Sequence, residues 1–161
     1  MLCCNHSSFS DPIWVIVGGN LDELPRTMAK KELEKNIPLW YLYRRLGAFP
    51  VDRENRDVAA LQTAMHALRD GKKVLIFPEG TRMRPGKVAQ PHNGAVMLAA
   101  RQKVPLIPIY LTQKKRLFGR IDLVFGEPMT FPFAGRRATA EELDTATAEL
   151  MQTIYGLGEA K

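Results

Sequence analysis

The 161-residue chain predicts a single α/β domain, with a mostly parallel, twisted sheet flanked by helices. Strand-like apolar segments alternate with helical segments along the whole sequence, which is the order typical of parallel sheets covered on both faces. The composition, 45% apolar and 25% charged, is that of a globular protein with one core. No apolar run approaches the roughly 18 residues of a membrane-spanning helix, and no secretory signal is readable. We therefore expect one domain over residues 1–161.

The strands are predicted from short apolar runs bounded by Gly, Pro and polar residues. The clearest is Lys73 to Phe77, a continuous apolar pattern that ends in a Pro-Glu-Gly turn. The segment Val104 to Tyr110 contains two prolines, which favours an edge strand or an irregular one. The full set of expected strands is Arg26 to Lys30, Ala48 to Val51, Lys73 to Phe77, Val104 to Tyr110 and Ile121 to Phe125.

The helices are predicted from capping residues and from apolar spacing of three and four. Asp11-Pro12 is typical of a helix start, with the Asp accepting from free N–H groups. A second helix, Glu32 to Leu46, is expected to be interrupted near Pro38. The remaining helices are expected at Asp57 to Arg69, Asn93 to Arg101 and Thr139 to Tyr155.

The charge distribution limits the classes of partner. The net charge is +6, and between Arg82 and Arg120 there are nine basic residues and no carboxylate. Such a surface suits phosphorylated substrates or anionic lipid, or is simply a solvated basic face. Nucleic-acid binding is not expected, because no aromatic-studded basic strand or recognition helix is present. Cys3 and Cys4 are adjacent and form no disulfide framework, which fits a reducing compartment.

The first chemistry-bearing stretch runs from Asn5 to Asp11. A His five positions before an Asp can fold back so that the carboxylate binds one ring nitrogen and the other serves as a general base. The alternative is that Asp11 only caps the helix and His6 is a loop residue. Ser7 or Ser8 could instead be a nucleophile activated by His6, but neither lies in the Gly-x-Ser-x-Gly sequence that is typical of nucleophilic serines. Cys3, Cys4 and His6 lack a second ligand cluster, so no metal site is expected.

The second stretch is Phe77 to Arg82, read Phe-Pro-Glu-Gly-Thr-Arg. Gly80 permits a tight turn after the strand, and the Arg82 guanidinium has the planar fork that suits phosphate. The spacing is not that of a nucleotide-binding P-loop. Taken alone, Pro-Glu-Gly is also an ordinary turn, so the assignment depends on the motifs around it.

In this order the motifs resemble those of the glycerolipid (lysophospholipid) acyltransferase family, in particular of bacterial enzymes that acylate 1-acyl-sn-glycerol-3-phosphate. Asn5, His6 and Asp11 match its NHxxxxD motif, and Phe77 to Arg82 matches FPEGTR in full. The other matches are Ala29-Lys30-Lys31-Glu32-Leu33 with Gly47 and Val51-Asp52-Arg53, the Val-Pro-Leu-Ile-Pro-Ile run of 104–109, and Phe125-Gly126-Glu127-Pro128. Met83 stands where members usually have Ser. His6 lies almost at the start, so the usual N-terminal hydrophobic helices are expected to be lacking.

The resemblance implies a site and a reaction. His6 and Asp11 are the expected catalytic base and its orienting carboxylate, and Lys30 is the expected oxyanion contact. Arg53, Glu79, Gly80, Thr81 and Arg82 are the expected substrate-binding residues. A fatty acyl group passes directly from a thioester of coenzyme A or acyl carrier protein to the sn-2 hydroxyl of lysophosphatidic acid. The product is phosphatidic acid, and no cofactor or metal is needed.

The resemblance also implies a location, and it leaves alternatives open. The expected place is the cytoplasmic face of the cell membrane, attached peripherally, with Lys114-Lys115-Arg116 and Leu117-Phe118 on anionic headgroups. Acyl carrier protein is a possible partner. Another lysolipid acceptor, such as a lyso-ornithine lipid, uses the same His6 chemistry. A truncated, non-catalytic lipid-binding chain is the alternative outside enzymes.

Overall fold

The computed structural model describes residues 1–52, 58–83, 91–115, 119–133 and 138–159. Within them one six-stranded sheet has the order β3-β2-β4-β1-β5-β6. The strands are β1 (Leu2–Cys4), β2 (Arg26–Lys30), β3 (Ala48–Val51), β4 (Val74–Ile76), β5 (Ile107–Leu111) and β6 (Leu123–Phe125). All neighbouring pairs are parallel except β5 and β6. The predicted single α/β domain with a mostly parallel sheet is therefore confirmed.

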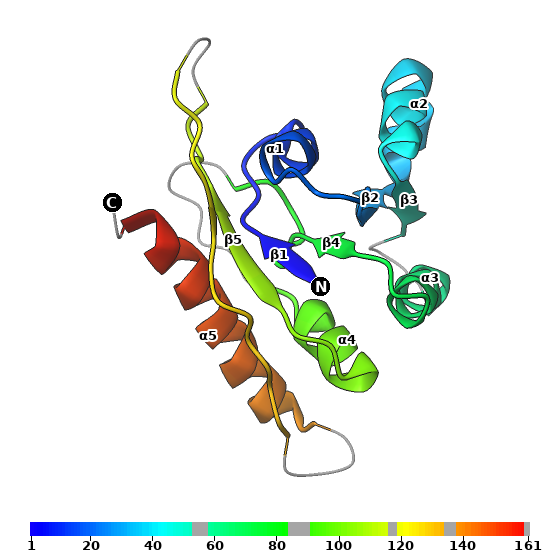
Figure 1. Cartoon of the computed structure of the whole chain (residues 1–161). Coiled ribbons are helices and arrows are strands. Elements are labelled where there is room, and N and C mark those ends of the chain that lie inside the picture. The colour runs from blue at the N-terminus through cyan, green and yellow to red at the C-terminus, as the bar shows by residue number, and fades with distance from the viewer. Residues whose placement is uncertain (53–57, 84–90, 116–118, 134–137, 160–161) are drawn as a thin grey trace.

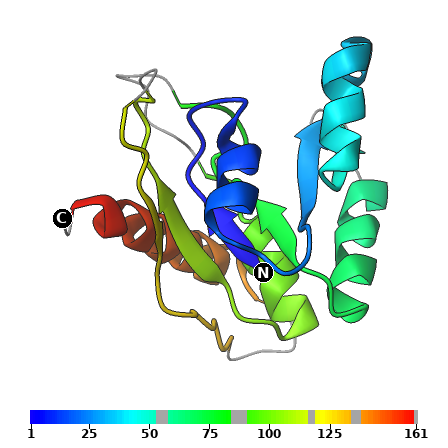
Figure 2. The same cartoon turned by 45° about the horizontal axis from the view of Figure 1, so that its top comes forward.

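Helices cover the two faces of the sheet unequally. In Figure 1, α3, α4 and α5 lie on one side of the sheet and α1 lies on the other. Figure 2 shows α2 standing beside β2 and β3 at the edge. The helices are α1 (Asp11–Gly18), α2 (Ile37–Arg45), α3 (Val58–Arg69), α4 (Gly94–Gln102) and α5 (Ala140–Glu159), with a 3₁₀ helix at Lys31–Lys35.

Side-chain alternation along the central strands divides the core in two. Cys3 and Ile76 face the larger cluster, built with α3, α4 and α5. Leu2, Cys4 and Phe77 face the smaller cluster, which Val15 of α1 covers. Because both faces of β1 and β4 are buried, their carboxyl ends are fixed in place. The loops that carry His6 and Phe77 to Arg82 leave the sheet there.

The central strand β1 was not predicted. It pairs in parallel with β4 on one side and β5 on the other, although it has three residues. Every one of those residues is buried. A run this short shows no alternation over several residues, so only its neighbours in the sheet reveal it as a strand.

The helix predicted over Glu32 to Leu46, with an interruption near Pro38, is found as two separate helices. The 3₁₀ helix ends at Lys35, and α2 begins at Ile37. Between them, the Asn36 side chain accepts a hydrogen bond from the Leu39 N–H at 3.3 Å. Pro38 lies in the first turn of α2, where its missing N–H has no helical partner to lose. Asn36 and Pro38 thus start a new helix rather than interrupt an existing one.

The strand predicted over Val104 to Tyr110 is confirmed, but it lies inside the sheet and not at the edge that its prolines suggested. The strand begins at Ile107, and β5 is paired on both sides, by β1 and β6. The N–H groups of Ile107 and Leu111 point to the β1 side, so the N–H that Pro108 lacks belongs to the β6 side. There the Pro108 carbonyl still accepts from the Gly126 N–H at 2.8 Å, beyond the end of β6.

No described helix has both the length and the apolar character needed to span a bilayer.

Candidate active site

Asn5 continues the sheet one residue beyond β1. Its side-chain Oδ1 accepts from the Leu111 N–H at 2.7 Å, and its Nδ2 donates to the Leu111 carbonyl at 2.9 Å. The amide therefore pairs with β5 as a strand residue would, and it is 1% exposed. This pairing fixes the point at which the chain turns away from the sheet, and His6 is the next residue.

His6 and Asp11 meet, as the sequence predicted. His6 Nδ1 lies 2.9 Å from Asp11 Oδ2. The same oxygen accepts the N–H groups of Ser7 at 2.6 Å and Ser8 at 2.7 Å, so the loop wraps around the carboxylate. Since an ionised carboxylate only accepts hydrogen bonds, this contact favours the neutral tautomer that has its proton on Nδ1 and its lone pair on Nε2.

Asp11 is not the helix cap that the sequence suggested. It is the first residue of α1, and Ser10 occupies the capping position without a side-chain hydrogen bond. The Asp11 carboxylate instead binds groups of the preceding loop and is fully buried. Burial alone would raise its pKa, but the contacts with His6, Lys115 and the Ser8 and Ser7 amides outweigh burial and lower it.

The backbone of His6 is held on both sides. Its N–H donates to Glu79 Oε2 at 3.1 Å, and its carbonyl accepts from the Met83 N–H at 2.8 Å. The imidazole stacks on the Phe77 ring with the centroids 4.4 Å apart. The FPEGTR segment therefore contacts the imidazole through Phe77 and the His6 backbone through Glu79.

Glu79 was expected to bind substrate, but the structure places its carboxylate inside the protein. The residue is 2% exposed, and its Oε1 accepts from the hydroxyl of Tyr155 on α5. Burial raises the pKa of the Glu79 carboxyl, although the hydrogen bonds from Tyr155 and the His6 N–H oppose the rise. Both contacts are with the protein, so Glu79 positions His6.

Lys115 was expected on lipid headgroups, and this expectation is wrong. Its side chain is only 12% exposed, and its Nζ lies 2.6 Å from Asp11 Oδ1 and 2.9 Å from Ser7 Oγ. Lys114 is exposed, whereas Arg116-Leu117-Phe118 lies outside the described residues. The Ser8 hydroxyl pairs with that of Ser10 at 3.0 Å, so the described contacts of the two serine hydroxyls are with Lys115 and Ser10.

A cavity of about 490 Å³ lies in front of the imidazole. Lys30, Thr81 and Arg82 share its wall with residues of α1 and α2. The Arg82 guanidinium lies over the Phe9 ring, 3.5 Å from its centroid, and Arg82 is exposed. Lys30 Nζ is paired with Glu32 at 3.2 Å and is half exposed. Arg53, also expected to bind substrate, lies outside the described residues.

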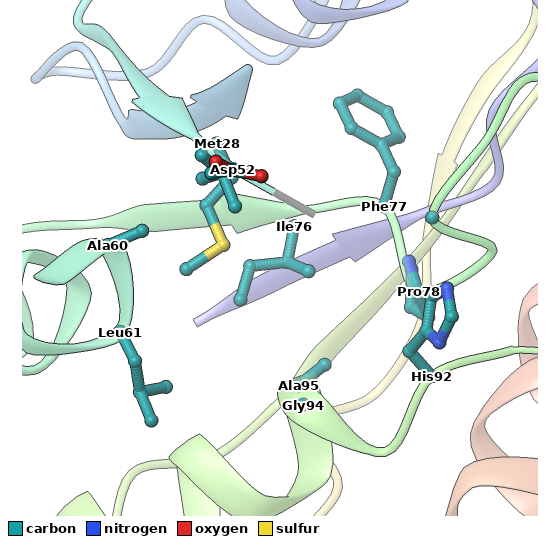
Figure 3. A pocket seen from close by; sticks show the side chains of 12 residues that line it. Met28, Asp52, Ala60, Leu61, Ile76, Phe77, Pro78, His92, Gly94 and Ala95 are labelled. Carbon is teal, nitrogen blue, oxygen red and sulfur yellow. The ribbon is translucent and has the colours of Figure 1, made fainter. Parts of the chain in front are cut away.

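A second cavity, of about 400 Å³, adjoins the first, because Met28 and Phe77 line both. Figure 3 shows Met28, Leu61 and Ile76 around it, with His92 beside Pro78 at one end. Its lining is mainly apolar, so it accepts a hydrocarbon chain more readily than a charged group.

Gly80 belongs to the turn after β4 and lines this second cavity. It has a φ of +66°, and a Cβ built there would lie 2.3 Å from His92 Cδ2. Both the left-handed backbone and the close approach of the ring require glycine. Gly80 therefore shapes the wall of the site by having no side chain.

Among the described residues no three His, Cys, Asp or Glu side chains are grouped as a metal site requires. The arrangement provides a base with an oriented ring, two exposed cations beside it, and adjoining polar and apolar cavities. Such a set of groups can take a proton from an alcohol and hold an anionic, long-chain molecule.

Sequence reasoning missed Lys115 and Tyr155 as parts of the site. Both are far from His6 along the chain, and neither belongs to a motif that the sequence shows. Topology brings them in: Lys115 follows β5, the neighbour of β1, and Tyr155 lies on α5, which packs against β5.

Comparisons with known proteins agree with the geometry. The acyltransferase family model matches residues 1–112. The 1-acyl-sn-glycerol-3-phosphate acyltransferase of Bacillus subtilis is 35% identical over 98% of this chain and 80% of its own length. That of Streptococcus pneumoniae is 31% identical over 80% of this chain, which spans 49% of the relative.

A solved structure shows the same fold. The crystal structure of the 1-acyl-sn-glycerophosphate acyltransferase PlsC from Thermotoga maritima superposes with a TM-score of 0.70 at 30% identity. The match covers 99% of this chain and 65% of that one. From the family match over 112 residues and the relative at 35% identity, together with the paired His6 and Asp11, the chain belongs to the acyltransferase family.

Proposed function

We propose that this protein transfers a fatty acyl group from a thioester to the sn-2 hydroxyl of 1-acyl-sn-glycerol-3-phosphate, giving phosphatidic acid in phospholipid biosynthesis. The observation that carries the proposal is the His6–Asp11 contact of 2.9 Å at the wall of a cavity that also has Arg82 and Lys30. The names of the B. subtilis and T. maritima relatives support the acceptor.

The proposed mechanism is direct transfer without an acyl-enzyme. His6 Nε2 takes the proton of the acceptor hydroxyl as its oxygen attacks the thioester carbonyl. Asp11 holds the ring through Nδ1 and stabilises the imidazolium that forms. When the C–S bond breaks, the imidazolium returns its proton to the leaving thiolate. Since a thiolate leaves readily, positioning, a base and oxyanion stabilisation supply the catalysis.

Each cation at the cavity has a proposed role. Arg82 binds the acceptor's phosphate through its guanidinium fork, and Arg53, outside the described residues, is proposed to assist it. Lys30 turns from Glu32 to the developing oxyanion. This movement is feasible because the ion pair of Lys30 with Glu32 is half exposed and therefore weak. Gly80 and Thr81 shape the end of the cavity near the glycerol. The apolar cavity behind Met28 and Phe77 receives hydrocarbon.

Peripheral attachment to the cytoplasmic membrane face is part of the proposal. Trp14 and Val17 on α1 and Ile37 and Tyr41 on α2 are exposed apolar side chains, between 38% and 76% accessible. Residues of the same two helices line the cavity beside His6. Arg45, in the last turn of α2, lies over the Tyr41 ring. Exposed apolar side chains and a basic residue on the helices that border the cavity suit an anionic bilayer.

The test measures thiol release and phosphatidic acid from lysophosphatidic acid with acyl-CoA or acyl carrier protein as donor. We expect turnover with at least one donor, and comparison of the two identifies it. His6→Ala should abolish turnover with the fold intact by circular dichroism. His66→Ala, at an exposed position on α3, is the matched control and should retain full activity. Absence of wild-type turnover with either donor, with and without vesicles, contradicts the proposal.

A further inference from the structure

Lys115 is a charged side chain turned into the protein beside the proposed catalytic pair. It lies in the loop after β5, three residues beyond the stretch that the family model matches. Its ammonium contacts both Asp11 Oδ1, at 2.6 Å, and Ser7 Oγ, at 2.9 Å. The two contacts connect this loop with the segment that carries His6.

The two oxygens of Asp11 have different partners. Oδ2 accepts hydrogen bonds from the His6 ring nitrogen Nδ1 and from the backbone N–H groups of Ser7 and Ser8. Oδ1 is buried and has no partner among the described residues other than the Lys115 ammonium. Its compensation among these residues is the ion pair with Lys115. A buried carboxylate oxygen without a cation or donor is strongly unfavourable, so Lys115 has a defined function at this position.

The ion pair has two consequences for the imidazole. It fixes the rotation of the Asp11 carboxylate, and with it the direction in which Oδ2 meets Nδ1. It also offsets part of the negative charge of Asp11, which would otherwise favour the protonated ring. A general base must be unprotonated before it takes the proton of the alcohol. A cation bound to the far oxygen of Asp11 therefore favours the active form of His6.

We propose that Lys115 is a positioning residue of the His6–Asp11 pair, which orients the carboxylate and keeps the imidazole available as a base. This role in catalysis rests on the proposed function, but its effect on the ring does not require turnover. Lys115 touches neither reacting atom and acts through Asp11.

Other charged and titratable groups surround the pair. Cys4 of β1 and Tyr43 of α2 interact electrostatically with Asp11, and Glu79 of the turn after β4 binds the His6 N–H. Arg82 lines the same cavity as His6, and Tyr155 of α5 binds Glu79. All of them stay unchanged when Lys115 alone is replaced. A difference between the wild type and a Lys115 variant therefore isolates the effect of the ammonium.

The experiment follows the ring signals of ¹³C-labelled histidine by NMR as a function of pH, with His6→Ala assigning the His6 signal. Lys115→Met should move the His6 titration to higher pH by about one unit. The reason is that the negative charge of Asp11, which favours the protonated ring, is no longer offset by the ammonium. Lys115→Gln, also neutral but still a donor, should give the same direction. Lys115→Arg should restore the wild-type titration in large part. Lys114→Met, at the exposed neighbouring position, is the matched control and should leave the His6 ring titration unchanged.

Activity in non-ionic detergent gives the second readout. Lys115→Met should shift the acidic limb of the kcat/KM profile in the same direction and lower the plateau of kcat about tenfold, with the acceptor KM little changed. An unmoved ring titration in both folded neutral variants overturns the inference. A rise in acceptor KM without that titration change identifies a headgroup contact and also overturns it. If the wild type shows no turnover, the proposed function fails while the titration still decides the role of Lys115.

Discussion

Replacing Asp11 by Asn tests whether the charge of this buried residue holds the site together. The substitution keeps the size of the side chain and removes its charge. In the wild type, Oδ2 accepts three hydrogen bonds and Oδ1 faces the Lys115 ammonium. In Asp11→Asn, an amide oxygen at the Oδ2 position still accepts from the loop. The amide NH₂ then points at Lys115, which loses its anion.

The expected loss of stability follows from these contacts. A hydrogen bond to a charged group contributes roughly 1.5–3 kcal/mol, against about 1 kcal/mol for a neutral one. Weakening the three bonds to Oδ2 should therefore lower the free energy of unfolding by about 3 kcal/mol at pH 7. Lys115, which is 12% exposed, is expected to turn towards solvent, so its lost ion pair should add little.

The pH dependence has a defined sign. The pKa of the Asp11 carboxyl is lower in the folded protein than in the unfolded chain, because the contacts with His6, Lys115 and the two amides outweigh burial. The stabilisation is therefore complete above the unfolded value, about 4, and disappears as the pH falls through the lower folded value. The difference between the wild type and Asp11→Asn should be largest at neutral pH and should shrink below about pH 4.

Urea unfolding at several pH values and thiol release at pH 7 measure the two effects. Activity should fall by roughly 10³ to 10⁴, the loss typical when a catalytic His loses its orienting carboxylate. Asp122→Asn, on the partly exposed carboxylate that pairs with Arg120, is the control for charge removal and should change stability by less than about 1 kcal/mol. A stability difference that is the same at every pH, or activity within tenfold of the wild type, would refute the reasoning.

The remaining predictions concern the cavities and the link to α5. Arg82→Ala should raise the KM for lysophosphatidic acid roughly tenfold to a hundredfold with kcat nearly unchanged. Steady-state kinetics check this, and an equal rise in KM for a phosphate-free lysolipid would contradict phosphate binding. Leu61→Trp should fill part of the apolar cavity, so competition between acyl chains should shift towards shorter ones; an unchanged preference would argue against hydrocarbon there. Tyr155→Phe removes the donor to Glu79 and should lower stability by about 1 kcal/mol in urea and kcat several-fold, whereas an increase in KM alone would argue against a positioning role.

Local sequence signals predicted much of the fold. The strands Arg26–Lys30 and Ala48–Val51 have the predicted bounds, because each is a short segment between clear turn residues. The predicted strand Ile121 to Phe125 exists over Leu123–Phe125 but is antiparallel, which its own residues do not indicate. Strand direction depends on the length and path of the connection, and these are not written in the residues of the strand itself.

The candidate site was predictable only where its partners are close in sequence. His6 and Asp11 are five residues apart, so a helix start was enough to suggest that they meet. The inward direction of Glu79 depends on Tyr155, and that of Lys115 depends on Asp11. Such contacts arise from the order of strands in the sheet. A Lys-Lys-Arg run is most simply interpreted as a surface, and only the folded chain shows that one of its members is inside.

The pairing of Asn5 with Leu111 also bears on the chemical lifetime of the enzyme. Asparagine deamidates when the backbone nitrogen of the following residue attacks the side-chain amide carbon. Here that nitrogen belongs to His6 and is engaged by Glu79, while the amide is held flat against the backbone of Leu111. Both reacting groups are thus held in positions that hinder formation of the cyclic imide, the first intermediate of deamidation. The contacts that place the proposed base should therefore also protect the residue before it from spontaneous hydrolysis.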